Sequence, residues 1–319
     1  MTEYILAVDI GGSKYMIALL DSHGSLVEVS YHKWRTLSKA NVIDETITST
    51  RELLGKHLDK SPSMIGITIP GLADPRRGIW LKSSFSGIGN LRIGSIFQKE
   101  FGIPVYIDND AQACALAEKI FGACKDKENF LYMTISNGIG GAVFTNNMLY
   151  YGGYGHAGEI GHCIVVEDGY PCKCGNNGCL EMHAAGPGIV RTYLSLAGNS
   201  GPYDKSLDAK AIAELAKKGD ATALKTFQLE GYYIGKVVAT ISNVLNPEIV
   251  VIGGGVSLSF SLFEESLNKT MDKYLFKSAN PNLKIQASQF GYNGGIYGAA
   301  AVALSGKNQL YNWANLSLG

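Results

Sequence analysis

The sequence predicts an α/β protein of two domains, and three observations support this fold class. The chain has 319 residues, 46% of them hydrophobic, which is too long for one ordinary core and suits two. Along it, short apolar stretches typical of buried strands alternate with stretches of helical spacing. A unit of strand, glycine-rich turn and strand also occurs twice, from residue 4 and again from residue 130. A duplicated unit of this kind indicates two related domains around a cleft.

The apolar pattern places the individual elements. Strands are expected at residues 4–9 and 14–20, which form a hairpin, and at 64–69, 105–108, 130–135, 142–145 and 249–252. Helices are expected at residues 41–58, 111–121, 209–218, 221–245 and 295–304, the last rich in alanine and glycine and therefore closely packed. Residues 150–181 are rich in Gly, Cys and His and read as an irregular insertion. Residues 305–319 suggest no chemistry.

Charge and hydropathy limit the classes of partner. Lys and Arg number 28, as do Asp and Glu. Nucleic acid or an anionic membrane would require a basic patch, so this balance favours a small soluble substrate. The apolar stretch between Glu3 and Asp9 is too short for a signal peptide, and no segment approaches the roughly 20 apolar residues of a membrane span. We therefore expect a cytoplasmic protein with no nucleic-acid or membrane partner.

Three glycine-rich loops follow predicted buried strands: DIGGSK at 9–14, ISNGIGG at 135–141 and VIGGGVS at 251–257. Glycine lets backbone N–H groups approach phosphate oxygens. In the first loop Ser13 adds a hydroxyl, Lys14 adds a cation, and Asp9 is placed to hold a Mg²⁺-bound water. The third loop precedes a helix, whose N-terminus favours an anion. One such loop could be an ordinary turn, but three of them match the strand ends at which α/β proteins bind ligands.

A run of histidine and cysteine predicts a metal site. The chain has six cysteines, and three of them crowd together after a histidine. Three thiolates and one imidazole make a closed tetrahedral Zn²⁺ site of the structural kind. The alternative, free cysteines beside a surface histidine, does not explain the crowding. The predicted ligands are His162, Cys172, Cys174 and Cys179, whereas Cys163 is expected to point away.

Acidic and amide side chains lie where a substrate hydroxyl could be bound. Asp108, Asn109 and Asp110 end a predicted strand, where one carboxylate could accept a proton and another residue could cap the following helix. Glu159 and Glu181 flank the predicted metal ligands. Both suit sugar hydroxyls, which need fixed acceptors, whereas without the surrounding motifs solvated charges would be the preferred interpretation.

These segments together resemble the ROK family of sugar kinases and sugar-responsive repressors. The resemblance is carried in order by DIGGSK, GITIPGLAD (66–74), DNDAQACALAE (108–118), HAGEIGH (156–162), CKCGNNGCLE (172–181) and IVVIGGGVS (249–257). It spans residues 4–304. The HAGEIGH and histidine–cysteine segments are highly specific, whereas glycine loops are not.

The resemblance implies an actin-like (ribonuclease H-like) two-domain sugar kinase fold with a structural zinc insertion. The smaller α/β domain is expected at 1–116 plus 295–319. The larger is expected at 117–294, with the zinc insertion at 156–181. Sugar would bind deep in the cleft with ATP and Mg²⁺ above it, and the protein is expected to be a homodimer.

The resemblance also implies a role for each matching residue. Asp110 would be the catalytic base, and Gly71 would line the pocket through its backbone. Sugar hydroxyls would be held by Asn109, Asp110, Glu159, His162 and Glu181, with His162 using its other ring nitrogen for zinc. The phosphates, Mg²⁺ and nucleotide would lie against Asp9, Gly11, Gly12, Ser13, Lys14, Asn137, Gly138 and Gly254.

The sequence departs from the family pattern at three places. Ser13 replaces the usual threonine and keeps the hydroxyl. Asn137 stands where a hydroxyl normally donates to phosphate, which puts the affinity for the phosphoryl donor, and its identity, in question. The segment 293–295 reads Asn-Gly-Gly where Asp-Ala-Gly is common.

Three functions are compatible with this pattern. A hexokinase-type enzyme acting on glucose is favoured by family frequency, with N-acetylmannosamine, N-acetylglucosamine and allose as alternatives. A sugar-sensing repressor would need a helix-turn-helix before the first glycine loop, and that loop begins at Asp9. A kinase-like protein that lacks activity is disfavoured by the presence of Asp9, Lys14 and Asp110.

Overall fold

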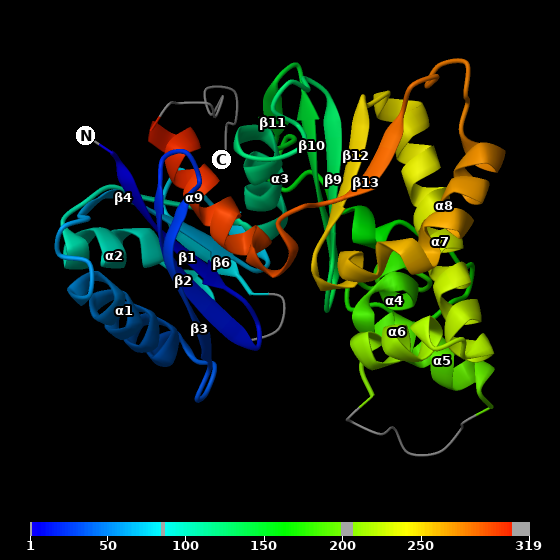
Figure 1. The fold of residues 1–319 in the computed structure, drawn as a ribbon, viewed down its shortest axis with the longest axis horizontal. Coiled ribbons are helices and arrows are strands. Elements are labelled where there is room, and N and C mark those ends of the chain that lie inside the picture. Colours follow the sequence, from blue (N-terminus) through cyan, green and yellow to red (C-terminus); the bar gives the residue numbers. More distant parts are fainter. Residues whose placement is uncertain (1, 84–86, 199–206, 308–319) are drawn as a thin grey trace. The chain divides into compact units, whose positions relative to one another are not determined.

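The computed structural model describes residues 2–83, 87–198 and 207–307, and the chain forms two compact units (Figure 1). The first unit comprises Met1–Asp126, Phe144–Ala157 and Tyr292–Gly319, and the second comprises Lys127–Val143 and Gly158–Gly291. The domain limits expected from the sequence stay a prediction, because compactness alone does not define an independently folding domain.

A five-stranded sheet in the order β3-β2-β1-β4-β8 forms the centre of the first unit. β1 (Tyr4–Ile10), β2 (Lys14–Asp21) and β3 (Leu26–Lys33) are antiparallel neighbours. β4 (Pro62–Ile69) runs parallel to β1, and β8 (Val105–Asn109) runs parallel to β4. A small sheet joins β5 (Leu72–Asp74), β6 (Ile79–Lys82) and β7 (Gly89–Leu91).

Alternating side chains of the central strands build two cores in this unit. Leu6 and Val8 of β1 belong to the core that also contains residues of α1 (Lys39–Gly55) and α2 (Ile93–Phe101). Ile5 and Ala7 point to the opposite face and pack with α9 (Gly294–Lys307). Because both faces are covered, β1 is an almost continuous apolar run.

Helix α9 lies unusually close to its neighbours, as its small residues predict. A side chain at Gly66 of β4 would overlap the backbone carbonyl of Ala299. A side chain at Gly298 would approach Ala113 of α3 (Asp110–Ile120) to about 3 Å. The helix therefore packs closely against both the middle of β4 and the first turn of α3.

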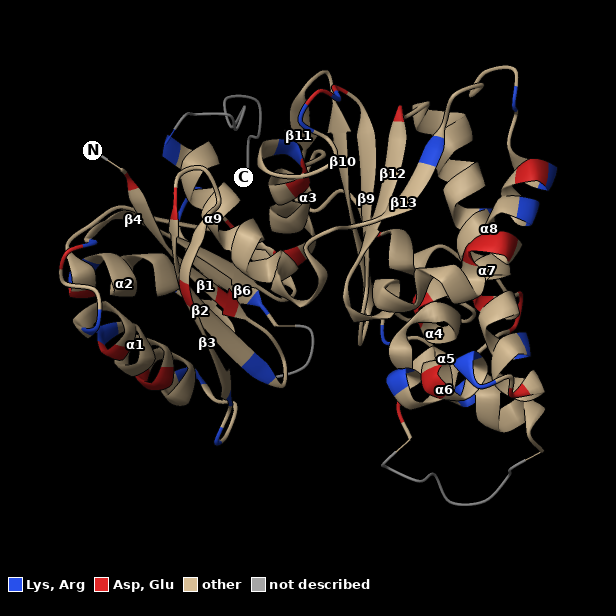
Figure 2. Ribbon diagram, in the orientation of Figure 1, with Lys and Arg blue, Asp and Glu red and all other residues tan. Residues whose placement is uncertain are grey.

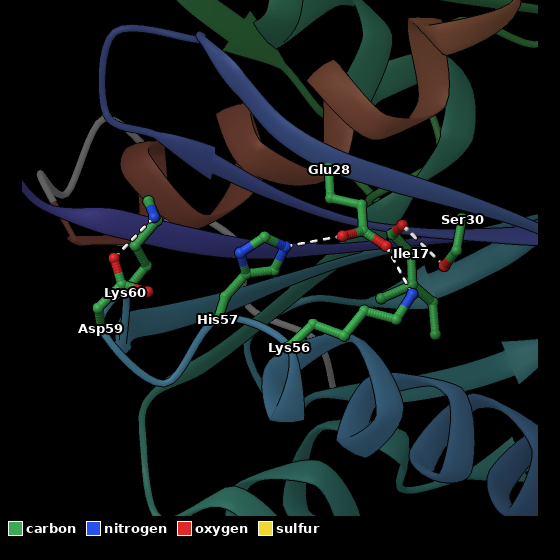
Figure 3. A network of polar contacts seen from close by, with 7 residues as sticks. All are labelled: Ile17, Glu28, Ser30, Lys56, His57, Asp59 and Lys60. Carbon is green, nitrogen blue, oxygen red and sulfur yellow. Dashed lines mark hydrogen bonds and ion pairs between the residues drawn. The ribbon is translucent and has the colours of Figure 1, made fainter.

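Surface charges join α1 to the sheet edge (Figure 3). The carboxylate of Glu28 on β3 accepts from Lys56 Nζ at 2.8 Å and lies 2.7 Å from His57 Nε2, both just after α1. Hydrogen bonds from these two side chains lower the pKa of Glu28. On the same strand, Ser30 Oγ donates to the carbonyl of Ile17 at 3.2 Å. Exposed pairs of this kind orient an element more than they stabilise it.

A second five-stranded sheet has the order β11-β10-β9-β12-β13. Its strands are β9 (Phe130–Ile135), β10 (Ile139–Thr145), β11 (Met148–Tyr150), β12 (Ile249–Gly253) and β13 (Lys284–Ala287). β12 lies parallel to both β9 and β13. In the second unit the helices are α4 (Leu180–Ala184), α5 (Gly186–Leu196), α6 (Ala209–Lys217), α7 (Ala221–Leu245) and α8 (Phe260–Tyr274). Among the described residues, one apolar core contains side chains of the sheet and of all five helices.

Charges of both signs are spread over the helices of each unit, while the sheet interiors carry almost none (Figure 2). Among the helices of the described residues, none is both long enough and apolar enough to cross a lipid bilayer.

The predicted strands and helices are present with small shifts of their ends, and one detail of the pattern was wrong. Gly140 and Gly141 were expected in a turn, yet both belong to β10. A side chain at Gly141 would approach the carbonyl oxygen of Gly158 to 2.8 Å and would overlap Ile160. Gly141 therefore allows close packing, and the turn is confined to 136–138. The insertion contains short regular pieces: η1 (Ile160–His162), a 3₁₀ turn, and the start of α4.

Helix α7 buries an acidic side chain whose carboxyl group makes no hydrogen bond among the described residues. This side chain is that of Glu230, which is 2% exposed. Burial raises the pKa of Glu230 well above its usual value. As pH rises past that usual value, the unfolded chain loses this proton while the folded chain keeps it, so stability falls with pH.

We expect Glu230→Met to stabilise the protein by about 1–3 kcal/mol near neutral pH, the usual cost of an unsatisfied buried polar group. The gain in unfolding temperature should be larger at pH 8 than at pH 5. Calorimetric unfolding at both pH values measures it. The control is Glu265→Met, at a side chain that is 81% exposed. A gain that does not depend on pH would contradict this account.

Candidate functional site

The junction between β8 and α3 carries the predicted base. Asn109 caps α3, because its Oδ1 accepts from the backbone N–H of Ala111 at 2.9 Å and of Gln112 at 3.4 Å. Its Nδ2 donates to the carbonyl of Gly71 at 2.7 Å. Gly71 has a φ of +87°, which few other residues adopt. Asp110 is the first residue of α3, with Oδ1 2.8 Å from the N–H of Ala111. The cap and the predicted base are thus different residues.

Asp108 lies directly behind this junction and is fully buried. Its Oδ2 accepts from Tyr151 Oη at 2.5 Å, and its Oδ1 accepts from the backbone N–H of Asn109 at 2.7 Å. Burial raises the pKa of Asp108 to about 7, although these two hydrogen bonds oppose the shift. The sequence marked Asp108 as an acid near the site but gave no sign of Tyr151.

The first glycine loop is a tight turn between β1 and β2. The N–H of Gly11 donates to the carbonyl of Lys14 at 2.9 Å, and a side chain at Gly11 would approach that oxygen to the same distance. Trp34 Nε1 donates to the carbonyl of Gly11 at 2.9 Å and holds the loop from behind. Gly12 is partly exposed and Ser13 is exposed. The loop therefore presents backbone and a hydroxyl to solvent, as a phosphate loop must.

Asp9 lies at the end of β1 beneath this loop. Thr68 Oγ1 donates to Asp9 Oδ1 at 2.6 Å, and burial raises the pKa of Asp9 against the opposing effects of Thr68 and Lys14. A side chain at Gly295 of α9 would overlap the Asp9 carboxylate. Only glycine at 295 therefore lets the start of α9 meet this acid. The ammonium group of Lys14 lies 5.3 Å from the ring centre of Tyr292.

In the second unit, His162, Cys172, Cys174 and Cys179 each place one ligand atom within 4.8 Å of the others. All three sulfurs belong to free cysteines. Without a cation, burial and the neighbouring sulfurs of Cys174 and Cys172 raise the pKa of Cys179 to about 12. A bound cation would remove this repulsion, so the donor set fits a metal ion. Cys163 is outside the cluster and packs against the apolar core, as expected.

Glycines shape the loop that carries these ligands. Gly175 and Gly178 have φ values of +101° and +75°, and a side chain at Gly178 would overlap the carbonyl of Val166. Isolated bridges pair Ile164 with Cys179 and Pro171 with Asn177. The loop thus folds back on itself and brings cysteines from its two ends together.

The two nitrogens of His162 face different partners. Nδ1 lies 3.6 Å from Cys172 Sγ, and Nε2 lies 3.7 Å from Glu159 Oε2. The first nitrogen faces the metal ligands, while the second lies beside an acid whose side chain is 58% exposed. This geometry suits an imidazole that binds a metal on one side and a polar group on the other.

Glu181 contacts the second glycine loop. Its Oε2 accepts from the N–H of Ile139 at 2.9 Å, and a side chain at Gly138 would approach that oxygen to 2.5 Å. Within the loop, the N–H of Ser136 donates to the carbonyl of Gly138 at 2.8 Å. Asn137, at the tip, is exposed. A residue predicted for sugar thus touches a loop predicted for phosphate.

The second and third glycine loops meet. Gly254 has a φ of +83°, and a side chain there would overlap the backbone of Ile135, where the second loop begins. Ser257 Oγ donates to the carbonyl of Gly254 at 2.7 Å. The structure therefore brings Gly138 and Gly254 to neighbouring turns of the second unit.

Each unit thus assembles its own group of predicted residues. The first contains Asn109, Asp110 and Gly71 and the loop from Asp9 to Lys14, all at or just beyond the ends of the neighbouring strands β8, β4 and β1. The second contains the candidate metal cluster with Glu159 and Glu181, and the two contacting loops. Sequence reasoning did not find Tyr151, Trp34 or Thr68, each of which supports a site residue through one hydrogen bond. No pattern marks them, because each lies far along the chain from its partner.

Comparison with known proteins extends over nearly the whole chain. A glucokinase of Halalkalibacterium halodurans is 30% identical over 97% of this chain and 97% of its own length. The crystal structure of a ROK family glucokinase from Streptomyces griseus, in complex with glucose and AMPPNP, aligns with a TM-score of 0.83. It is 27% identical and covers 96% of this chain and 100% of that one.

A regulator is equally similar in structure. The crystal structure of a ROK family transcriptional regulator, a homologue of the Escherichia coli MLC protein, aligns with a TM-score of 0.86 at 27% identity. The alignment covers 97% of this chain and 78% of that one. These likenesses confirm the expected α/β fold of the actin-like sugar kinases. The sequence model described as the ROK family matches residues 5–305, and this chain is therefore a member of that family.

Proposed function

We propose that this protein is an ATP-dependent sugar kinase that transfers the γ-phosphoryl group of ATP to a hydroxyl of a hexose, glucose before others. The arrangement of Asn109 and Asp110 carries the proposal. Asn109 donates to the carbonyl of Gly71 and also caps α3. Asp110, the first residue of the helix, therefore places a carboxylate beside a side chain that is held in position. The glycine loops supply the surface that a nucleotide requires.

The reaction assigned to Asp110 is a proton transfer coupled to phosphoryl transfer. The carboxylate accepts the proton of the sugar hydroxyl as the oxygen attacks the γ-phosphorus. The new O–P bond forms while the bond from the γ-phosphorus to the bridging oxygen breaks, and ADP leaves with those electrons. Mg²⁺ bound with ATP would neutralise phosphate charge. Lys14 and the N–H groups of the first loop add to that neutralisation.

We assign the cluster of His162, Cys172, Cys174 and Cys179 to one structural Zn²⁺ ion. Three sulfurs and one nitrogen within 4.8 Å support this choice, since soft thiolates with imidazole favour zinc. In this proposal Glu159, Glu181 and the Nε2 of His162 hold sugar hydroxyls.

Glucose is proposed because a relative that covers 97% of this chain is named a glucokinase. N-acetylmannosamine, N-acetylglucosamine and allose are the other acceptors, and none is distinguished by a pocket residue. The identity of the phosphoryl donor is a second question, because the exposed Asn137 stands where the family usually has a hydroxyl. We further propose that the protein works in the cytoplasm as a homodimer, which light scattering after size exclusion would test.

A sugar-sensing role without turnover is the second candidate. It is favoured by the likeness to a transcriptional regulator at a TM-score of 0.86 and by an amide at Asn137. Such a protein would bind sugar but would not consume ATP.

A coupled assay with Mg²⁺-ATP and a panel of hexoses separates the candidates. We expect turnover with one hexose well above the others. Calorimetric titration with each sugar accompanies the assay. Sugar binding without ADP formation would reject the kinase and favour the sensor.

A further inference from the structure

Tyr151 and Asp108 form a buried pair behind the proposed base. Tyr151 lies just beyond β11 and is 6% exposed, while Asp108 is 0% exposed at the end of β8. Their oxygens lie 2.5 Å apart. The two residues come from distant parts of the sequence, yet both belong to the first unit.

The pair is joined directly to the backbone that carries the base. One oxygen of Asp108 accepts from Tyr151, and the other accepts from the N–H of Asn109 at 2.7 Å. Because a carboxylate is planar, fixing one oxygen fixes the direction of the other. The hydroxyl of Tyr151 therefore adds a side-chain constraint to the peptide between residues 108 and 109, which the pairing of β8 with β4 also holds.

That peptide sets the direction of the next two side chains. Asn109 spans from the carbonyl of Gly71 to the first N–H groups of α3, and Asp110 follows at once. A rotation of the peptide would move Asn109 off both partners and would turn Asp110 with it. Burial of a polar pair is costly unless its hydrogen bonds are made, so the pair holds one geometry.

We propose that Tyr151, acting through Asp108, is a positioning residue that aligns Asp110 with the attacking hydroxyl. The inference rests on the proposed kinase activity. Tyr151 touches neither substrate nor phosphate in this account. Its effect is on the geometry of the base, so it should appear in kcat and not in the binding of either substrate.

Tyr151→Phe tests this, because it removes one oxygen and keeps the ring. We expect kcat to fall about 10–100-fold, since a misplacement of about 1 Å can cost about 10²-fold. The KM values for sugar and ATP should stay within about threefold, because the loss concerns the transition state alone. The matched control is Thr46→Val, which removes another fully buried hydroxyl from the first unit, one that bonds within α1. It should lower the unfolding temperature and leave kcat unchanged.

Asp108→Asn completes a double-mutant cycle. If the two residues act as one device, the double variant should lose no more kcat than the worse single variant. Additive losses, or a folded Tyr151→Phe protein with wild-type kcat, would overturn the inference. If Tyr151→Phe does not fold, the test rests on Asp108→Asn. A wild-type kcat for the Asp108→Asn protein would also overturn the inference. A wild-type protein without turnover on any sugar would instead reject the proposed function, and this inference with it.

Discussion

Asp110→Asn is expected to lose about 10²–10⁴-fold in kcat, the usual contribution of one positioned base. An amide has nearly the shape of the carboxylate but cannot take a proton from the sugar hydroxyl. Its oxygen can still accept from the N–H of Ala111, so α3 should start normally. Steady-state kinetics with Mg²⁺-ATP and the preferred hexose would measure the loss. Calorimetry should show sugar affinity close to that of the wild type.

The control for this variant is Asp220→Asn. Asp220 also stands at the start of a helix, where its side chain accepts from the N–H of Ala223 at 2.7 Å. Asparagine caps as well as aspartate, so neither stability nor kcat should change. Near-normal turnover by Asp110→Asn would remove this residue from the mechanism and leave the proton acceptor unassigned.

Cys172→Ala is expected to abolish sugar binding, or to raise the KM for sugar strongly, while ATP binds almost normally. The reason lies in the loop around the metal ligands. Glu181 follows Cys179 closely, and Glu159 lies beside His162. A loop with several glycines has large backbone entropy and cannot hold two carboxylates still unaided. A metal that fixes four points of the loop can do so.

Metal content and the two affinities are measured on the same preparation. Elemental analysis of wild-type protein, purified without added metal, should give one Zn²⁺ per chain, and the variant should have lost it. Circular dichroism checks the fold before titration with sugar and nucleotide separately. The control is Cys163→Ala, a neighbour of His162 outside the ligand cluster. Loss of nucleotide binding with sugar affinity retained would contradict the assignment of the metal to the acceptor side.

One contact limits how completely the Cys172→Ala variant can separate sugar binding from nucleotide binding. Glu181 accepts from the N–H of Ile139, next to Gly138 in the second glycine loop. Loosening Glu181 could therefore disturb nucleotide binding to a small extent. A modest fall in nucleotide affinity beside a complete loss of sugar binding would still support the acceptor-side role.

Short-range patterns determined most of the fold. The continuous apolar run of β1 reflects burial of both its faces, and the helical spacing of α7 reflects burial of one face, so both can be read locally. The bounds of helix α8 were not predicted, although its sequence carries a readable signal. In α8 the buried residues Phe263, Leu267, Thr270 and Met271 recur at helical spacing within an otherwise polar segment. Short edge strands such as β5 and β7 carry too few residues for any period to show.

The cluster of candidate metal ligands and the glycine loops could likewise be found from the sequence alone, because the chemistry sits in neighbouring residues. His162 and three cysteines fall within one loop, and their spacing limits what they can do. The site residues that matter through distant contacts were decided by tertiary structure. Nothing near Tyr151 marks it as a partner of Asp108, and nothing in the third loop shows that Gly254 must pack on Ile135. Hydrogen bonds and close approaches between distant segments depend on how the strands are ordered in a sheet, and a local pattern carries no record of that order.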